Sequence, residues 1–268
     1  MTEKKPRRVL IATLGQAPGT VTGMLDALAK AEEGPKVRMD EVVTLYTRDT
    51  ALFPISRFRS PREALTAYES HPLQVKVLCQ QLGPPQSGVF EAELYGHYER
   101  GWGTAPKFDP RVGYLQDRGQ GVEDITCDRQ NLLFLRLAYR TIAQHQQDGY
   151  EVYVSLAGGR KTMSALLYLA TQFSEKVTGC YHLIVPDEIE RLSGIEQWSG
   201  LTPTDKQRVL HPGEESTLVP IPVIGLPQEW RESEAFKALV QRYFGKDVPL
   251  DESTMKDLTQ AFEGALDR

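Results

Sequence analysis

The chain has 268 residues, of which 40% are hydrophobic and 25% are charged, and its formal net charge is −5. These values are typical of a globular protein and exclude a collagen-like, low-complexity or wholly disordered chain. The mild acidity argues against an extended cationic surface for duplex nucleic acid, but it leaves room for a small local basic site. No apolar run reaches the roughly 18 residues that a membrane-spanning helix needs, so we expect a soluble, cytoplasmic protein.

Apolar runs alternate with glycine-rich turns and helical patterns along most of the chain. The expected strands cover residues 9–14, 41–47, 74–78, 150–156, 180–185 and 217–224. The expected helices cover residues 21–28, 61–70, 131–145, 161–173, 231–244 and 252–266. This order predicts βαβ units and therefore a Rossmann-like, three-layer α/β fold with a mostly parallel sheet. The last strand should lie at an edge, because its prolines cannot donate to a ladder.

Two segments depart from this pattern. Residues 83–121 are rich in glycine, proline and aromatic residues, and we interpret them as a long insertion. Such a segment either closes over a ligand by stacking or packs its own aromatic side chains on the surface. Residues 227–268 form a short helical extension of the main unit, which we place at 1–226. Residues 186–191 are expected to be a solvated acidic loop.

Cysteine and histidine give no sign of a metal centre. The three cysteines lie far apart: Cys79, Cys127 and Cys180. They match neither a disulfide framework nor a CxxC site, so we expect buried free thiols. Three histidines lack metal-ligand spacing: His71, His97 and His211. We therefore expect no metal ion and no other cofactor.

Two turns, each between an expected strand and an expected helix, are the strongest candidates for chemistry. The first reads TLGQAPGT over residues 13–20, and the second reads SLAGGRKTM over residues 155–163. Ligands of open α/β sheets bind at this end of the strands, and helix N-termini favour phosphate. Arg160 and Lys161 add full positive charges, and Thr20 and Thr162 can cap the helices or contact a ligand.

Neither turn matches a standard nucleotide motif. The second turn is not a Walker A loop, because Arg160 separates Gly159 from Lys161, and the first is not GxGxxG. A nucleoside triphosphatase or a nicotinamide enzyme is therefore disfavoured. The alternative without a ligand is that the glycines only permit tight turns and that the two cations are solvated.

These segments resemble the CRISPR-associated Rossmann-fold (CARF) family, and in particular its small stand-alone branch. The similar segments are VLIATLGQAPGTVTGMLDAL, VYVSLAGGRKTMSALLYLA and YHLIVP, and the resemblance covers roughly residues 8–226. It implies a homodimer that binds cyclic oligoadenylate, the second messenger of type III CRISPR defence. It also implies ring-nuclease activity, in which a ribose 2′-hydroxyl attacks the adjacent phosphate without a metal ion and leaves a 2′,3′-cyclic phosphate.

The resemblance assigns roles to the residues of the two turns. The implied catalytic residues are Lys161, as the main phosphate and transition-state cation, with Arg160, Thr13 and Gln16. The implied ligand-binding residues are Gly15, Ala17, Pro18, Thr20, Ser155, Ala157, Gly158, Gly159, Thr162 and His182. Ala17 departs from the family pattern, in which serine often precedes this proline, so Thr13, Gln16 or Thr20 must replace that hydroxyl, or cleavage is slow.

Several alternatives remain open at this point. His182 either borders the ligand or is a satisfied residue of the core or its rim. Arg140 and His145 match the R-x4-6-H spacing of a ribonuclease, but they lie on a helix of the main unit, which disfavours that activity.

A sensor without catalysis, or a transcriptional regulator, is a rival to the enzyme. The tail, with nine acidic and six basic side chains, disfavours a DNA-binding module. A nucleotide-binding metabolic protein unrelated to defence is a weaker rival.

Overall fold

The structure, a computed structural model, describes residues 6–15, 17, 19–30, 37–47, 107–108, 115–117, 120–122, 124–193 and 200–244. Four predicted features lie wholly or mostly outside these described residues: the helix over 61–70, the strand over 74–78, the insertion over 83–121 and the helix over 252–266.

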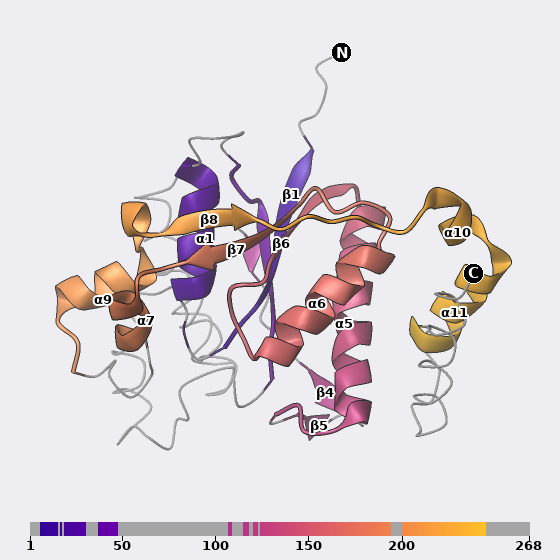
Figure 1. Cartoon of the computed structure of the whole chain (residues 1–268), viewed down its shortest axis with the longest axis horizontal. Coiled ribbons are helices and arrows are strands. Elements are labelled where there is room, and N and C mark those ends of the chain that lie inside the picture. The colour runs from indigo at the N-terminus through magenta and orange to yellow at the C-terminus, as the bar shows by residue number, and fades with distance from the viewer. Residues whose placement is uncertain are drawn as a thin grey trace, which may run out of the picture.

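A six-stranded sheet forms the centre of the described part of the chain (Figure 1). Its strands, in spatial order, are β3 (Lys107–Phe108), β2 (Glu41–Leu45), β1 (Arg7–Thr13), β6 (Tyr150–Ser155), β7 (Gly179–Ile184) and β8 (Thr217–Pro220). All neighbours are parallel except β7 and β8, which are antiparallel. The predicted mostly parallel α/β sheet is confirmed, and β8 lies at its edge as its prolines require.

The two central strands, β1 and β6, end at the same level. Their register pairs Val9 with Val152 and Ala12 with Ser155. The four residues from Val9 to Ala12 are completely buried, because helices cover both faces of the sheet. A continuous apolar run is the sequence signature of such a strand, which explains why it could be predicted.

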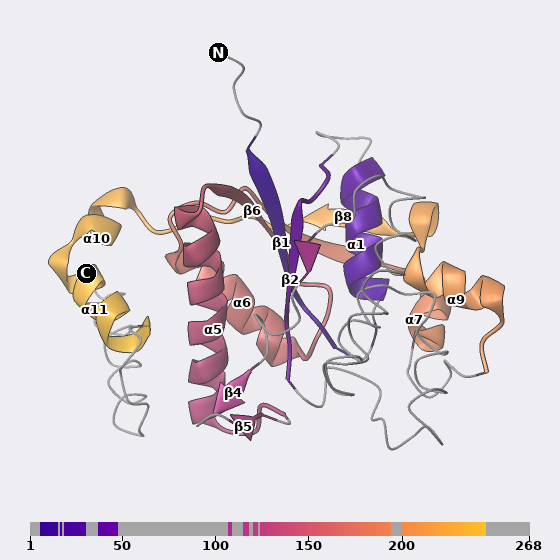
Figure 2. The ribbon, with the colours of Figure 1, turned by 180° about the vertical axis from the view of Figure 1, so that it is seen from behind.

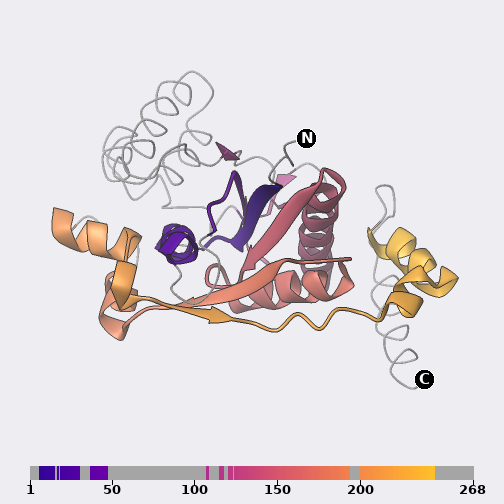
Figure 3. The same ribbon diagram turned by 90° about the horizontal axis from the view of Figure 1, so that it is seen from above.

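Helices cover the sheet on both faces (Figure 3). One face carries α1 (Gly19–Lys30), and the other carries α5 (Asp128–Gln147) and α6 (Lys161–Phe173). Alternate residues of β1 point to the two cores, with Leu10 in the α1 core and Ile11 in the α5–α6 core. The chain therefore forms the three layers that the sequence predicts.

The two helices of the second core follow from their apolar spacing. In α5 the buried residues include Leu132, Leu135 and Ile142, and the helix ends before Gly149, whose φ of +77° is a left-handed conformation. The helix α6 has the predicted bounds, and Met163 and Leu167 bury its apolar side. The helix α5 leads into the start of β6, and α6 follows the end of β6. Both helices therefore have their N-termini at the carboxyl-terminal edge of the sheet.

A short helical group packs beside α1, and part of it corrects the sequence analysis. Residues 187–192 form the helix α7 (Asp187–Leu192), not the expected loop. The acidic residues of its first turn stabilise the helix, because they lie at the positive end of the helix dipole. Ile189 is buried and anchors the helix to the protein. The helix α9 (Pro203–Leu210) follows, and the 3-10 turn η2 (Gly213–Glu215) leads into β8.

A partly buried hydrogen bond joins this group to α1. The Asp26 carboxylate lies 2.7 Å from Nδ1 of His211, and the Asp26 residue is only 4% exposed. On the outside, Arg208 contacts both Glu188 and Glu215, which links α7, α9 and η2. The pKa of Glu215 is lowered by its hydrogen bond from Arg208.

The described part of the C-terminal extension packs on the α5–α6 side (Figure 2). It contains α10 (Gln228–Glu232) and α11 (Glu234–Phe244), separated at Ser233, where one helix was expected over 231–244. The buried ring of Phe236 stacks on Phe173 at a centroid distance of 6.3 Å and contacts Trp230 at 4.6 Å. This aromatic contact fixes the extension to the end of α6.

The two described cysteines differ in exposure. Both are free thiols; Cys180 is buried and Cys127 is exposed. Burial raises the pKa of Cys180 to about 12. The expectation of buried thiols is therefore correct for Cys180 and wrong for Cys127, while Cys79 lies outside the described residues.

Candidate functional site

The two glycine turns meet at the carboxyl-terminal edge of the sheet. From β1 the chain adds β2 on one side of the sheet, and it later adds β6 and β7 on the other side. The direction in which strands are added therefore reverses between β1 and β6. Such a switch point is where open α/β sheets bind ligands. The first turn follows β1 and the second follows β6, and both therefore open at this point.

The turns approach each other so closely that side chains are excluded. A Cβ atom added to Gly15 would lie 2.9 Å from the amide nitrogen of Gly159. A Cβ atom added to Gly158 would collide with the carbonyl oxygen of Thr13 and would lie 2.7 Å from the Thr20 hydroxyl oxygen. Glycine at 15 and 158 is therefore required by packing between the turns, and Gly159 also has a left-handed φ of +77°.

Two hydroxyl groups hold the second turn in place. Thr13 Oγ1 and Ser164 Oγ both donate to the carbonyl oxygen of Gly158, the latter at 2.9 Å, and the two hydroxyl oxygens lie 3.3 Å apart. The Thr13 residue is only 1% exposed. The predicted role of Thr13 in aligning a nucleophile remains a prediction, because the structure gives its hydroxyl a bond to the backbone.

Ser164 is a site residue that the sequence analysis missed. It lies in the first turn of α6, where its amide donates to the carbonyl oxygen of Arg160 at 3.2 Å. A hydroxyl residue at this position, on an otherwise apolar helical segment, was the available signal. Its partner could not be inferred, because Thr13 lies 151 residues away in sequence.

The N-terminus of α6 forms an exposed cationic edge of the site. Gly159, Arg160, Lys161 and Thr162 are all exposed, directly beside the buried Gly158. The first N–H groups of a helix lack partners within the helix and carry partial positive charge, which suits an oxyanion. With the described residues, the Lys161 side chain makes no hydrogen bond or ion pair. The structure thus brings the predicted cations together with the glycines of both turns.

Arg160 differs from Lys161 because it is already engaged. Its Nη2 lies 2.7 Å from the Asp124 carboxylate, with 49% of the Arg160 side chain and 24% of the Asp124 side chain exposed. Asp124 comes from the segment before α5, and the sequence analysis did not identify it.

Besides Thr13, three of the predicted residues of the first turn are described. Gly15 is buried, and Ala17 and Thr20 are half-buried at the start of α1, where Gly19 is the first helical residue. Thr20 donates its hydroxyl to the carbonyl oxygen of Ala17 at 2.8 Å, which closes the turn. Gln16 and Pro18 lie outside the described residues.

The remaining predicted residues lie on β6, on its turn and on β7. Ser155 is buried at the end of β6, and its hydroxyl accepts the amide of Ala157 at 3.4 Å. His182 is half-buried on β7, one residue beyond the pairing of Ser155 with Tyr181, so it lies at the same edge of the sheet. By alternation along β7 it lies on the α5–α6 face with Cys180.

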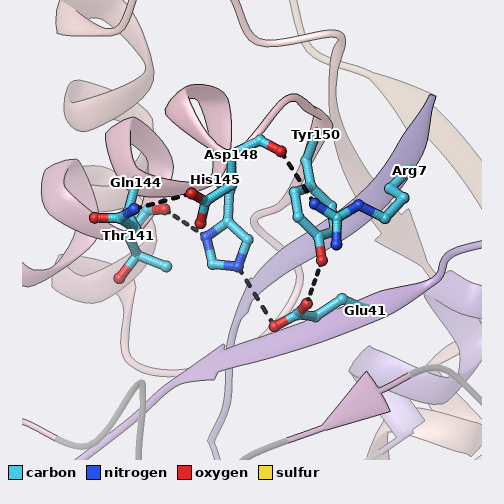
Figure 4. A network of polar contacts seen from close by, with 7 residues as sticks. All are labelled: Arg7, Glu41, Thr141, Gln144, His145, Asp148 and Tyr150. Atoms are coloured by element: carbon cyan, nitrogen blue, oxygen red, sulfur yellow. Dashed lines mark hydrogen bonds and ion pairs between the residues drawn. The ribbon is translucent and has the colours of Figure 1, made fainter.

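A second polar cluster lies at the opposite, amino-terminal edge of the sheet (Figure 4). Tyr150 donates to Glu41 at 2.9 Å, and the other Glu41 oxygen lies 3.5 Å from Nε2 of His145. His145 donates through Nδ1 to the carbonyl oxygen of Thr141 at 2.7 Å, and Arg7 lies 4.2 Å from the centre of the Tyr150 ring. His145 is thus a buried structural residue, which agrees with rejecting the ribonuclease pattern.

The described residues hold neither a metal-binding cluster nor a membrane-spanning helix. In that part of the chain, no group of three or more His, Cys, Asp or Glu side chains is arranged to hold a metal ion. None of its helices is both long enough and apolar enough to cross a membrane.

Fold and turns together define an α/β protein with a compact, cationic candidate site at the switch point of its sheet. Comparison with protein families then identifies the family: residues 63–248, more than two thirds of the chain, match the model of CRISPR-associated protein NE0113. The chain belongs to this CRISPR-associated family. The match includes the second turn with α5 and α6, and it begins after the first turn.

Other comparisons add less. No curated protein matches the chain. Among solved structures, the chain is similar to Enterococcus italicus Csm6 bound to cyclic hexa-2′-fluoro-hexa-dAMP, with 13% identity and a TM-score of 0.45. The similarity covers 98% of this chain but only 55% of that one. So weak a likeness does not identify a ligand.

Proposed function

We propose that the protein binds cyclic oligoadenylate, with cyclic tetra-adenylate as the first ring to test, at the two turns between β1 and β6. Membership of a CRISPR-associated family supports the biological setting. The observation that carries the proposal is local: Gly15 packs on Gly159, and Arg160 and Lys161 stand exposed beside them at the start of α6. Backbone without side chains, free N–H groups and full charges are what a phosphate needs.

We further propose that the protein cleaves this ring and so switches off type III CRISPR signalling. The 2′-hydroxyl oxygen attacks the adjacent phosphorus and the bond to the 5′ oxygen breaks. The proton lost by the 2′-hydroxyl is balanced by the one gained by the 5′ oxygen, which leaves a linear product with a 2′,3′-cyclic phosphate. The nucleophile belongs to the substrate, so the protein must orient it and stabilise the negative charge that develops on phosphorus. Lys161 is the proposed cation for that charge.

The proposed assembly is a homodimer with two copies of the site facing one ring. A single copy offers one helix N-terminus with two adjacent cations, whereas a ring of adenylates carries one phosphate per nucleotide. Two copies related by a two-fold axis would match the charge on both sides of the ring. In this proposal residues 1–226 form the ligand-binding unit, and residues 227–268 serve dimer packing or capping.

A sensor that binds without cleaving is the second candidate, and the hydroxyl groups favour it. Thr13 and Thr20 each donate to a backbone carbonyl, and Ser155 accepts from a backbone amide. Ala17 has no hydroxyl to replace them. With these three hydroxyl groups bonded to the backbone, a protein with these turns can hold a phosphate without using them to align the 2′-hydroxyl.

Incubation with cyclic tetra- and hexa-adenylate in EDTA, followed by mass spectrometry of the products, separates the candidates. A linear product with a 2′,3′-cyclic phosphate supports the ring nuclease. Binding of a ring without any linear product contradicts the enzyme and leaves the sensor. If neither ring binds, the proposed ligand is wrong.

A further inference from the structure

The ion pair between Asp124 and Arg160 places a carboxylate inside the proposed anion site. Asp124 Oδ2 lies 2.7 Å from Arg160 Nη2, and Asp124 Oδ1 accepts the amide of Ile125 at 2.8 Å. The backbone thus fixes the carboxylate through one oxygen while the other contacts the guanidinium. Arg160 is the residue that precedes α6, so this contact lies directly beside Lys161.

A guanidinium binds a carboxylate and a phosphate with the same donors, so one anion can replace the other. Nearly half of the Arg160 side chain is exposed, so a phosphate in solution can reach it. The Asp124 side chain is the more covered of the two. In such an exchange the phosphate takes the place of the Asp124 carboxylate at the guanidinium of Arg160. Asp124 itself stays in place, held by the Ile125 amide.

We propose that Asp124 is a built-in competitor for the ligand's phosphate at Arg160 and thereby sets the affinity of the site. This inference rests on the proposed function, because the competing anion is a phosphate of the cyclic oligoadenylate. Asp124 acts through Arg160 and is not a catalytic residue. Its charge makes the site selective, since a ligand with a single weak anionic contact does not displace it.

The opposite role for Asp124 is to hold Arg160 in the orientation that the ligand needs. The two roles predict opposite changes in ligand affinity when Asp124 is replaced. Loss of a competitor raises affinity, whereas loss of an orienting partner lowers it. An ion pair this exposed is worth a few tenths to about one kilocalorie per mole, which corresponds to a gain of roughly two- to fivefold in affinity.

The test is a double-mutant cycle on the full chain, with the affinity for cyclic tetra-adenylate measured by calorimetry. Asp124→Asn keeps an oxygen for the Ile125 amide and removes the charge, and we expect it to bind roughly two- to fivefold more tightly than wild type. Asp124→Ala should show the same gain. In the Arg160→Ala background, Asp124→Asn should have no effect, because the competition needs the guanidinium.

Glu151→Gln is the matched control, because it removes one negative charge from another partly exposed ion pair, in which Glu151 lies 2.8 Å from Arg8. It should leave affinity unchanged. Unchanged or weaker binding by both Asp124 variants would overturn the inference, and so would a gain that persists without Arg160. If wild type binds no ring, the proposed function fails; if wild type binds and neither Asp124 variant brings a gain, only this inference fails.

Discussion

At the amino-terminal edge of the sheet, Glu41, His145 and Tyr150 contact one another; Glu41 and His145 are buried, and Tyr150 is half-buried. At the carboxyl-terminal edge, Arg160 and Lys161 stand exposed at a helix N-terminus, beside glycines that are packed as tightly as a core. The same classes of side chain therefore serve two purposes. Where polar groups satisfy one another they stabilise the fold. At the other edge Arg160 pairs with Asp124, whereas the exposed Lys161 side chain makes no hydrogen bond or ion pair with the described residues.

The largest expected effect is on the packing between the turns. Gly158→Ala places a methyl group against the carbonyl oxygen of Thr13, and we expect it to lower the free energy of unfolding by about 3 kcal/mol. Urea denaturation measures this loss. Gly149→Ala is the control, because Gly149 has a φ of +77° but no atom near its added Cβ, and it should cost only about 1 to 2 kcal/mol. Equal losses would show that the turns are not tightly packed.

The next effect is on ligand affinity at the exposed edge. Lys161→Ala removes a charge-assisted contact to a phosphate, and we expect affinity for cyclic tetra-adenylate to fall roughly tenfold to a hundredfold. The melting temperature should not change, because the Lys161 side chain makes no hydrogen bond or ion pair with the described residues. Lys176→Ala, which removes an exposed lysine beyond the far end of α6, should bind as wild type does. Equal affinity of the two variants would remove Lys161 from the site.

A smaller effect, on stability alone, is expected at the amino-terminal edge. Glu41→Ala leaves the Tyr150 hydroxyl without its acceptor and removes the carboxylate beside His145, which should cost about 1 to 2 kcal/mol of stability. Ligand affinity, measured by titration well below the melting temperature, should stay within twofold of wild type. A large loss of affinity in this variant would mean that the two edges are coupled.

The smallest expected effect is a pH dependence of stability at the same edge. Burial, and then the hydrogen bond to Glu41, raise the pKa of Tyr150. The unfolded chain then releases this proton at a lower pH than the folded chain does. The contribution of Tyr150 is therefore complete below the unfolded pKa of about 10 and is lost as the pH rises through the folded pKa. As the pH rises from ~8 to ~11, the midpoint of urea denaturation should fall less steeply for Tyr150→Phe than for wild type. Parallel curves would contradict this.

Local patterns were sufficient for most of the described elements and for the positions of the two turns. The apolar run of β1 and the spacing in α6 predicted those elements, and the glycines marked the two turns that form the candidate site. The contacts across the site could not be predicted, because their partners are distant in sequence. Thr13 lies 145 residues from its acceptor Gly158, and the charge of Asp124 beside Arg160 depends on how α5 and α6 pack. The helix α7 was missed because its acidic first turn obscured a single buried isoleucine.

The central claim is that the ligand lies at the carboxyl-terminal edge and nowhere else on the sheet. Hydrogen exchange measured by mass spectrometry, with and without cyclic tetra-adenylate, tests this claim directly. We predict slower exchange in peptides that cover residues 13–20 and 156–164, and no change in peptides that cover residues 141–151. Slower exchange only in peptides that cover residues 141–151, with none in the two turns, would contradict this claim.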